Sequence, residues 1–190
     1  MQPTQLSRRE RRKQKTNRNL KDATEALLVE EGFDHLTIQK ITDRADLARA
    51  TFYLHFKDVE EAVWAVLADH FTHLSTIMWQ VDGQSLADRR FQKFVRVFDY
   101  LKANQALMLV LFGDKGHIKL LRRASAFMAA GLRSDIETGR VERISDLPID
   151  FEAQFYAGAV MQIAAWWLQN GMQEEPEAIS GMILTLVEGR

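Results

Sequence analysis

Five donor-bearing side chains recur at every second position between residues 49 and 57. They are Arg49, Thr51, Tyr53, His55 and Lys57. Guanidinium, ammonium and hydroxyl groups bind phosphate oxygens, and an arginine can also pair with both major-groove acceptors of guanine. Phe52 and Phe56 lie four residues apart and can anchor a short helix to a core. This spacing predicts a nucleic-acid contact made by one short helix.

The element expected to position these donors is a helix-turn-helix over residues 37–56. Thr37 carries a hydroxyl that can cap its first helix, and Ile38 and Ile41 share one apolar face. Asp46 falls at the expected turn, where a short polar side chain tolerates the left-handed conformation. The second helix, over residues 49–53, is too short to be stable alone and must be held by the core.

The segment from residue 20 to residue 62 resembles the DNA-binding domain of the TetR/AcrR family of bacterial transcription regulators. The matching residues are Ala23, Ala26, Leu27, Gly32, Phe33, Leu36, Thr37, Ile38, Ile41, Ala45, Leu47, the run from Thr51 to Asp58, Glu60 and Glu61. The resemblance implies a dimeric regulator, more often a repressor, that binds a palindromic double-stranded operator. The residues it implies at the DNA are Thr37, Arg49, Ala50, Thr51, Tyr53, His55 and Lys57.

Four positions depart from the family pattern. Asp46 replaces the turn glycine, Ala48 the usual capping Ser or Thr, Ala50 a small glycine, and Val59 a lysine. An absent cap costs about 1 kcal/mol. These departures leave open a second hypothesis, in which the same fold binds another protein and the DNA domain is degenerate.

Composition predicts an all-α chain, and the pattern of apolar residues and helix breakers along it predicts about nine helices. Only three of the 190 residues are proline, and 46% are hydrophobic. We expect a three-helix DNA-binding domain over residues 16–62 and a helical regulatory and dimerisation domain over residues 63–190. The chain has no cysteine, and no apolar run reaches the roughly 18 residues of a transmembrane helix. A cytoplasmic location, with no membrane partner, is therefore expected.

A near-neutral net charge of −1 conceals a basic N-terminus. Residues 1–21 carry eight Lys or Arg and one acid, so the rest of the chain carries a net −8. We expect residues 1–15 to form a flexible arm that is disordered, or helical only when bound, and that is either simply solvated or lies along DNA phosphates. The basic residues of this arm are Arg8, Arg9, Arg11, Arg12, Lys13 and Lys15.

The last two expected helices predict a homodimer interface. Residues 151–168 are apolar around most of the helix, which therefore has to be buried on two sides. A monomer with this helix at its centre is the alternative. The residues predicted at the interface are Phe155, Gly158, Ala159, Ile163, Trp167, Ile179, Met182, Ile183 and Leu186.

The middle helices are rich in aromatic residues and methionine, which suits either a pocket for a small apolar or aromatic effector or an ordinary core. The two interpretations are equally supported. The candidate pocket residues are Phe94, Phe98, Met108, Phe112, His117, Phe127, Met128, Tyr156, Gln162 and Trp166.

No pattern of residues predicts a cofactor, a metal site or an enzyme. His70 and His73, beside Asp69, form only a partial ligand set and are better explained as ordinary helix residues. The adjacent acids Glu30 and Glu31 diverge on a helix and cannot act as a catalytic pair. A small helical enzyme remains as a third, disfavoured hypothesis.

Overall fold

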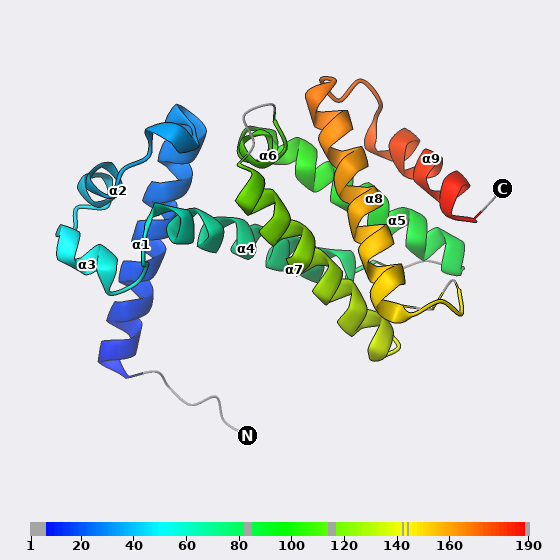
Figure 1. Cartoon of the computed structure of the whole chain (residues 1–190), viewed down its shortest axis with the longest axis horizontal. Coiled ribbons are helices and arrows are strands. Elements are labelled where there is room, and N and C mark those ends of the chain that lie inside the picture. Colours follow the sequence, from blue (N-terminus) through cyan, green and yellow to red (C-terminus); the bar gives the residue numbers. More distant parts are fainter. Residues whose placement is uncertain (1–6, 82–84, 114–116, 142, 144, 189–190) are drawn as a thin grey trace. The chain divides into compact units, whose positions relative to one another are not determined.

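The computed structural model describes residues 7–81, 85–113, 117–141, 143 and 145–188. In these residues there are nine α-helices, one short 3₁₀ helix and no strand, which confirms the predicted all-α class (Figure 1). The helices are α1 (Arg8–Glu31), α2 (Ile38–Arg44), α3 (Arg49–Tyr53), α4 (Val59–Met78), α5 (Leu86–Ala103), α6 (Gln105–Phe112), α7 (Ile118–Glu137), α8 (Ile149–Gln169) and α9 (Pro176–Glu188), with the 3₁₀ helix at Phe33–His35.

The chain forms two compact units, Met1–Asp69 and His70–Arg190, here called the N-terminal and the C-terminal unit. The division falls inside α4, whereas the sequence placed a domain boundary after residue 62, earlier in the same helix. No helix in the described part of the chain is both long and apolar enough to cross a bilayer.

The core of the N-terminal unit joins α1, α2, α3 and the first half of α4. Leu20 and Leu28 of α1, Ile41 of α2, Phe52 of α3 and Val63 of α4 are all fully buried. Helix α1 packs on α2, and α2 packs on α3. Because α2 and α3 each have so few residues, tertiary burial rather than intrinsic helix propensity must hold them in place.

Helix α1 begins earlier than the sequence suggested, and this corrects the expectation of a flexible arm. Ser7 starts the helix through a capping box: its Oγ accepts a hydrogen bond from the Glu10 N–H at 3.2 Å, and its own N–H donates to the Glu10 carboxylate at 2.8 Å. These hydrogen bonds lower the pKa of Glu10. The basic residues from Arg8 to Lys15 are therefore helical and exposed, while residues 1–6 lie outside the described part.

The C-terminal unit is a helical bundle in which α8 packs on α7 and α6, and α9 packs on α5 (Figure 1). Phe98 of α5 and Trp167 of α8 are both fully buried and meet edge to face, with ring centroids 5.1 Å apart. The indole N–H of Trp167 donates to the Glu174 carbonyl at 2.9 Å, so this buried polar group is satisfied.

Side-chain caps begin α1, α2, α4 and α5, whereas α3, α6, α7 and α8 begin without one. Asp58 accepts a hydrogen bond from the Glu61 N–H at 2.8 Å and caps α4. Asn104 is of a residue type that often caps helices and stands at the start of α6, but its side chain donates to the Tyr100 carbonyl and makes no cap hydrogen bond. The sequence also predicts turns at residues 82–85 and 113–116 and a loop at 140–147, and residues 82–84, 114–116, 142 and 144 of these segments lie outside the described residues.

Candidate nucleic-acid interface

Helices α2 and α3 form the predicted helix-turn-helix. Thr37 caps α2, because its hydroxyl accepts a hydrogen bond from the Lys40 N–H at 3.2 Å. Asp46 has φ +53°, the left-handed conformation predicted for the turn. The Leu47 N–H then donates to the Thr42 carbonyl at 2.9 Å, which closes the turn between the two helices.

Helix α3 is held by one buried side chain rather than by its cap. Ala48 stands at its N-cap and makes no side-chain hydrogen bond, as its residue type predicts. Phe52 is fully buried and lies against Phe56, with ring centroids 5.6 Å apart. The sequence-based prediction of this anchor is confirmed, and it leaves the opposite face of α3 to solvent.

The side chains predicted to contact DNA divide into an exposed and a half-buried group. Arg49, Ala50 and Tyr53 of α3 are exposed, as are Thr37 and Lys57, whereas Thr51 and His55 are half-buried. The guanidinium of Arg49 lies within 3.4 Å of the Tyr53 hydroxyl and donates to it. An arginine on an exposed helix face can donate to the major-groove acceptors of guanine.

His55 contacts α1 and does not stand free on the surface. Its Nδ1 lies 3.4 Å from the Asn17 side-chain amide, whose Nδ2 can donate to it. Burial lowers the pKa of His55, and the positive charge of Lys13 lowers it further. His55 therefore links the end of the helix-turn-helix to α1, and its predicted contact with the DNA backbone stays a prediction.

Leu54 is a surface residue that the sequence-based prediction of DNA contacts omitted. It follows Tyr53 directly, and its side chain is 76% exposed. The position of Leu54 indicated its exposure, because it lies four residues after Ala50 and shares the same helix face. Its residue type, an aliphatic one, suggested burial instead.

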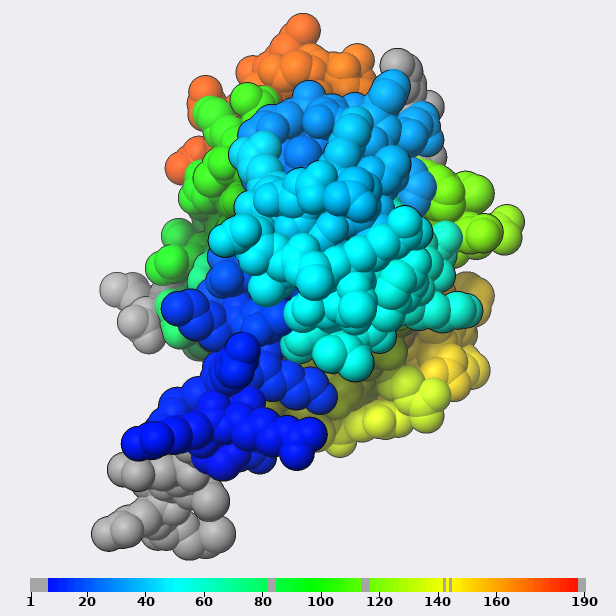
Figure 2. All heavy atoms as spheres, turned by 90° about the vertical axis from the view of Figure 1, so that its left-hand side faces the viewer, coloured from blue at the N-terminus to red at the C-terminus, as the bar shows by residue number. Residues whose placement is uncertain are grey.

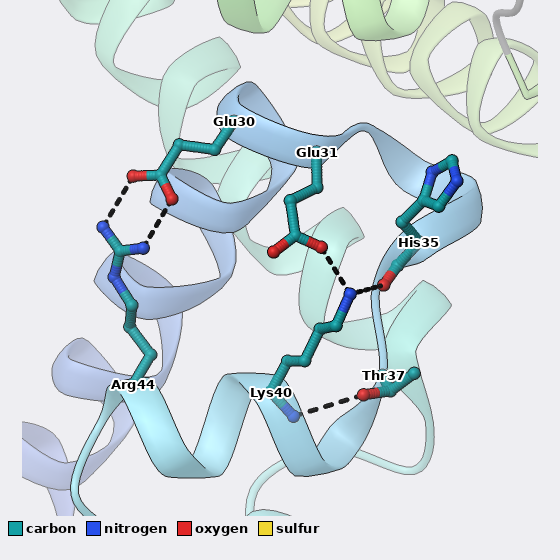
Figure 3. Close-up of polar contacts among 6 residues, drawn as sticks. All are labelled: Glu30, Glu31, His35, Thr37, Lys40 and Arg44. Carbon is teal, nitrogen blue, oxygen red and sulfur yellow. Dashed lines mark hydrogen bonds and ion pairs between the residues drawn. The ribbon is translucent and has the colours of Figure 1, made fainter.

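Two ion pairs fasten α2 to the end of α1 (Figure 3). Arg44 donates to both carboxylate oxygens of Glu30, at 2.6 and 2.7 Å. Lys40 donates to Glu31 at 2.6 Å and to the His35 carbonyl at 3.1 Å. The hydrogen bond from Arg44 lowers the pKa of Glu30, and the same contact raises the pKa of Arg44. Sequence reasoning missed both pairs.

The first turns of α1 carry half of the lysine and arginine residues of the N-terminal unit. Residues 8–15 are all exposed, and six of them are Lys or Arg. In Figure 2 these turns, in dark blue, and the cyan surface of α3 are both visible on the face turned to the reader. The unit thus presents α3 and the basic first turns of α1, residues 8–15, here called the basic rod, on one side.

The predicted dimer residues fall into two groups. Phe155, Gly158, Met182 and Leu186 are exposed, with Leu186 at 79%, and Ala159 and Ile163 are half-buried. Trp167, Ile179 and Ile183 are buried inside the C-terminal unit itself. They have almost no surface left for a partner to cover, so the interface prediction is wrong for these three.

The candidate pocket residues divide by burial. Phe98, Met108 and Phe112 are buried, Phe94, His117, Met128 and Tyr156 are half-buried, and Phe127, Gln162 and Trp166 are exposed. Gln162 and Trp166 lie on the face of α8 that carries Phe155 and Gly158, away from the unit's interior. Helix periodicity explains their exposure, because the buried face runs through Ala157, Met161, Ala164 and Trp167. The pocket itself stays a prediction.

The pair of histidines on α4 contacts a tyrosine. Nδ1 of His70 lies 2.6 Å from the Tyr100 hydroxyl, and the His73 ring lies 5.6 Å from the Tyr100 ring. Within the described residues, no three or more His, Cys, Asp or Glu side chains are grouped so that they could hold a metal ion.

An exposed short helix with an arginine, anchored by one phenylalanine behind a capped partner helix, is the arrangement of helix-turn-helix DNA-binding proteins. Residues 20–61 match the profile of bacterial regulatory proteins of the tetR family, and residues 88–189 match a transcriptional regulator C-terminal region of the TetR class. The chain belongs to the TetR family of transcriptional regulators.

Three known proteins illustrate the similarity. The HTH-type transcriptional regulator YvkB of Bacillus subtilis (strain 168) is 32% identical over 73 residues, which are 38% of this chain and 39% of YvkB. A TetR regulator structure from Streptococcus agalactiae 2603V has TM-score 0.68 at 23% identity, covering 94% of this chain and 97% of that one. The B. subtilis FadR structure with stearoyl-CoA has TM-score 0.62 at 18% identity, covering 90% and 96%.

The alignments with curated relatives are partial. The chain spans about two fifths of the length of the curated relatives it matches, 39% of one and 43% of another. The solved structures are under 25% identical, so their likeness establishes the fold.

Proposed function

We propose that the protein is a homodimeric, cytoplasmic transcriptional repressor that binds a palindromic operator. The observation that carries this proposal is the division of α3, where Phe52 is buried while Arg49 and Tyr53 remain exposed. The outward side chains of such a helix are not needed for the core, so this face is free to enter a major groove. Arg49 would read a guanine, and Thr37, Thr51, Tyr53 and Lys57 would fix the backbone.

The homodimer is supported by the apolar surface of α8 and α9. Phe151, Phe155 and Trp166 of α8 and Met182 and Leu186 of α9 are large apolar side chains left exposed in the single chain. Apolar groups gathered on a surface favour burial against a partner. A two-fold partner would cover them with the same surface, and two recognition helices would then read the two halves of a palindrome.

The basic turns of α1 would add affinity without sequence information. Phosphate contacts by lysine and arginine release counterions from the duplex, which drives binding at low salt. A helical rod holds its charges at fixed positions, and His55 and Asn17 link α1 to the end of the helix-turn-helix. The rod can therefore lie along the backbone next to the groove that α3 enters.

A small apolar or aromatic effector would act through the C-terminal unit. Phe98, Met108 and Phe112 form a buried apolar group, with Phe94 and Met128 half-buried. The related FadR structure holds stearoyl-CoA, which supports an apolar ligand for this fold. An effector that binds better to a state with low DNA affinity would shift the population towards that state and release the operator.

The direct test of the proposal is selection of genomic DNA fragments by the purified full chain, with and without an extract of cell metabolites. We expect enrichment of fragments that share an inverted repeat, and a fall in that enrichment when the extract contains the effector. If the extract leaves the enrichment unchanged, control by an effector is contradicted but DNA recognition is not. The absence of any enriched sequence would contradict DNA recognition. It would favour the hypothesis that the protein binds another protein, which the missing cap at Ala48 suggests.

A further inference from the structure

The exposed face of α3 has two chemically different edges. Arg49 and Tyr53, four residues apart, form a polar edge and contact each other. Ala50 and Leu54, also four residues apart, form an apolar edge beside it. Leu54 lies one residue past α3 but keeps the right-handed helical conformation, with φ −76° and ψ −13°, so the helical face continues through it.

Leu54 is too exposed to serve the fold. Its side chain is 76% exposed, more than that of Val29 or Tyr53, the other exposed large apolar residues of the described N-terminal unit. The core contact at this end of α3 is made by Phe52 and Phe56, which are buried. The apolar edge is therefore available to a partner.

The charge around the apolar edge favours DNA as that partner. Arg49 and Lys57 lie on either side of Leu54 along the chain, and both are exposed. Lys13 of the basic rod lies close enough to lower the pKa of His55, the next residue after Leu54. A basic border of this kind is complementary to phosphates and unsuited to an uncharged apolar protein surface.

The major groove offers one apolar group, the 5-methyl of thymine. We propose that Leu54, with Ala50, contacts a thymine methyl group and makes that base a determinant of the operator half-site. This inference rests on the proposed function and adds a specific contact to it. Arg49 would read a guanine by hydrogen bonds, while the neighbouring edge would read a methyl group by burial.

Deoxyuridine provides the sharpest test, because it keeps every hydrogen-bonding group of thymine and lacks only the methyl. An operator would first be selected by the full chain from random-sequence duplexes. Each thymine of one half-site would then be replaced in turn, and affinity measured by fluorescence anisotropy. At one thymine or more we expect affinity to fall roughly four-fold, the ratio that corresponds to burying one methyl-sized group.

The effect should depend on Leu54, and a cycle of protein and DNA changes isolates that dependence. In Leu54→Ala the decrease caused by deoxyuridine should be less than about two-fold, because the side chain that buries the methyl is gone. Val29→Ala, which trims an exposed apolar residue of α1, is the matched control and should keep the full effect. Unchanged melting temperatures would confirm that both variants fold.

Each remaining outcome rejects a distinct claim. A selected half-site in which no thymine is sensitive to deoxyuridine would overturn the inference and leave the proposed function intact. Sensitivity that persists in Leu54→Ala would also overturn it, because another group would then be reading the methyl. If the full chain selects no sequence from the library, the proposed function itself fails, and the inference with it.

Discussion

Phe52 and the residues beside it decide whether α3 can exist as a recognition helix. The missing cap at Ala48 costs about 1 kcal/mol, whereas removing a fully buried phenylalanine costs about 3–5 kcal/mol. Burial of Phe52 therefore outweighs the absent cap. Because the inward side chain of Phe52 supplies this stability, the outward side chains of α3 are not needed for folding and are available to contact DNA.

His55 makes the stability of the N-terminal unit depend on pH. Burial and the charge of Lys13 lower its pKa in the folded state below the usual 6.5, so the unfolded chain binds this proton more readily. As pH falls through 6.5 towards the lower folded pKa, the free energy of unfolding should fall. This free energy can be measured by urea unfolding, followed by circular dichroism, at a series of pH values from above 6.5 downwards.

His55→Gln should remove that part of the pH dependence, because glutamine does not titrate. His35→Gln alters an exposed side chain of the same unit and serves as the control, with the wild-type dependence retained. If the free energy of unfolding changes with pH in the same way in wild type and His55→Gln, the assignment to His55 is contradicted.

The sequence predicted the roles of residues that depend on their neighbours in the chain. It did not predict the roles that depend on residues far away in the sequence. Thr37 and Asp46 follow local rules for caps and turns, and each lies where the sequence indicated. The pairing of Glu30 with Arg44 joins two helices across a loop, and no local rule identifies it. Leu54 was missed because its type predicts burial while its position predicts exposure.

Helix register set the limit of prediction in α8. Its apolar residues surround most of the helix, so the sequence could not decide which of Trp166 and Trp167 faces inward. The structure buries Trp167 against Phe98 and exposes Trp166, the reverse of the expected roles. The extent of α1 was missed for a different reason, since the capping box of Ser7 and Glu10 went unrecognised within a basic stretch.

At the scale of elements, the ion pairs between α1 and α2 orient the helix on which α3 packs. Exposed ion pairs add little to stability, so the burial of Ile41 and Thr42 holds α2 while Arg44 and Glu30 set its direction. Arg44→Glu should therefore weaken operator binding with little change in melting temperature. Fluorescence anisotropy and thermal unfolding measure the two effects.

Adding Glu30→Arg to Arg44→Glu reverses the pair and should restore most of the operator affinity. Arg133 of α7, which is exposed and pairs with Glu137 and Asp150 in the C-terminal unit, provides the control, because Arg133→Glu should leave operator affinity near the wild-type value. If the reversed pair binds no better than Arg44→Glu alone, the pair does not orient α2.

Helix α1 should contribute through its charges and not through base recognition. Removal of residues 1–15 takes away six basic side chains, and the slope of log affinity against log salt should become shallower by about 0.9 for each phosphate that these side chains neutralise in the wild-type complex. Ser7→Ala removes the cap but keeps every charge, so its slope should stay close to wild type. An unchanged slope after truncation would exclude α1 from the interface.

At the scale of the whole molecule, dimer formation should depend on the exposed residues of α9. A two-fold interface presents the same patch twice, so Leu186→Glu would bring two charges into one apolar contact. Like charges brought together cost several kcal/mol, and we expect the dimer dissociation constant to rise roughly a hundredfold or more. Sedimentation velocity over a range of concentrations measures it.

Ile118→Glu is the matched control, because Ile118 is also an exposed aliphatic residue but lies on α7. It should sediment as the wild type does. Dissociation by Ile118→Glu with no effect of Leu186→Glu would place the dimer contact on a different surface.

The central claim, that the outer face of α3 reads DNA sequence, is tested most directly by a ratio of two dissociation constants. The ratio compares a scrambled duplex with the selected operator at one salt concentration. We predict a wild-type ratio of at least about a thousand, reduced roughly tenfold to a hundredfold in Arg49→Ala but unchanged in Lys57→Ala. A wild-type ratio near one, or a ratio indifferent to Arg49, would contradict the account.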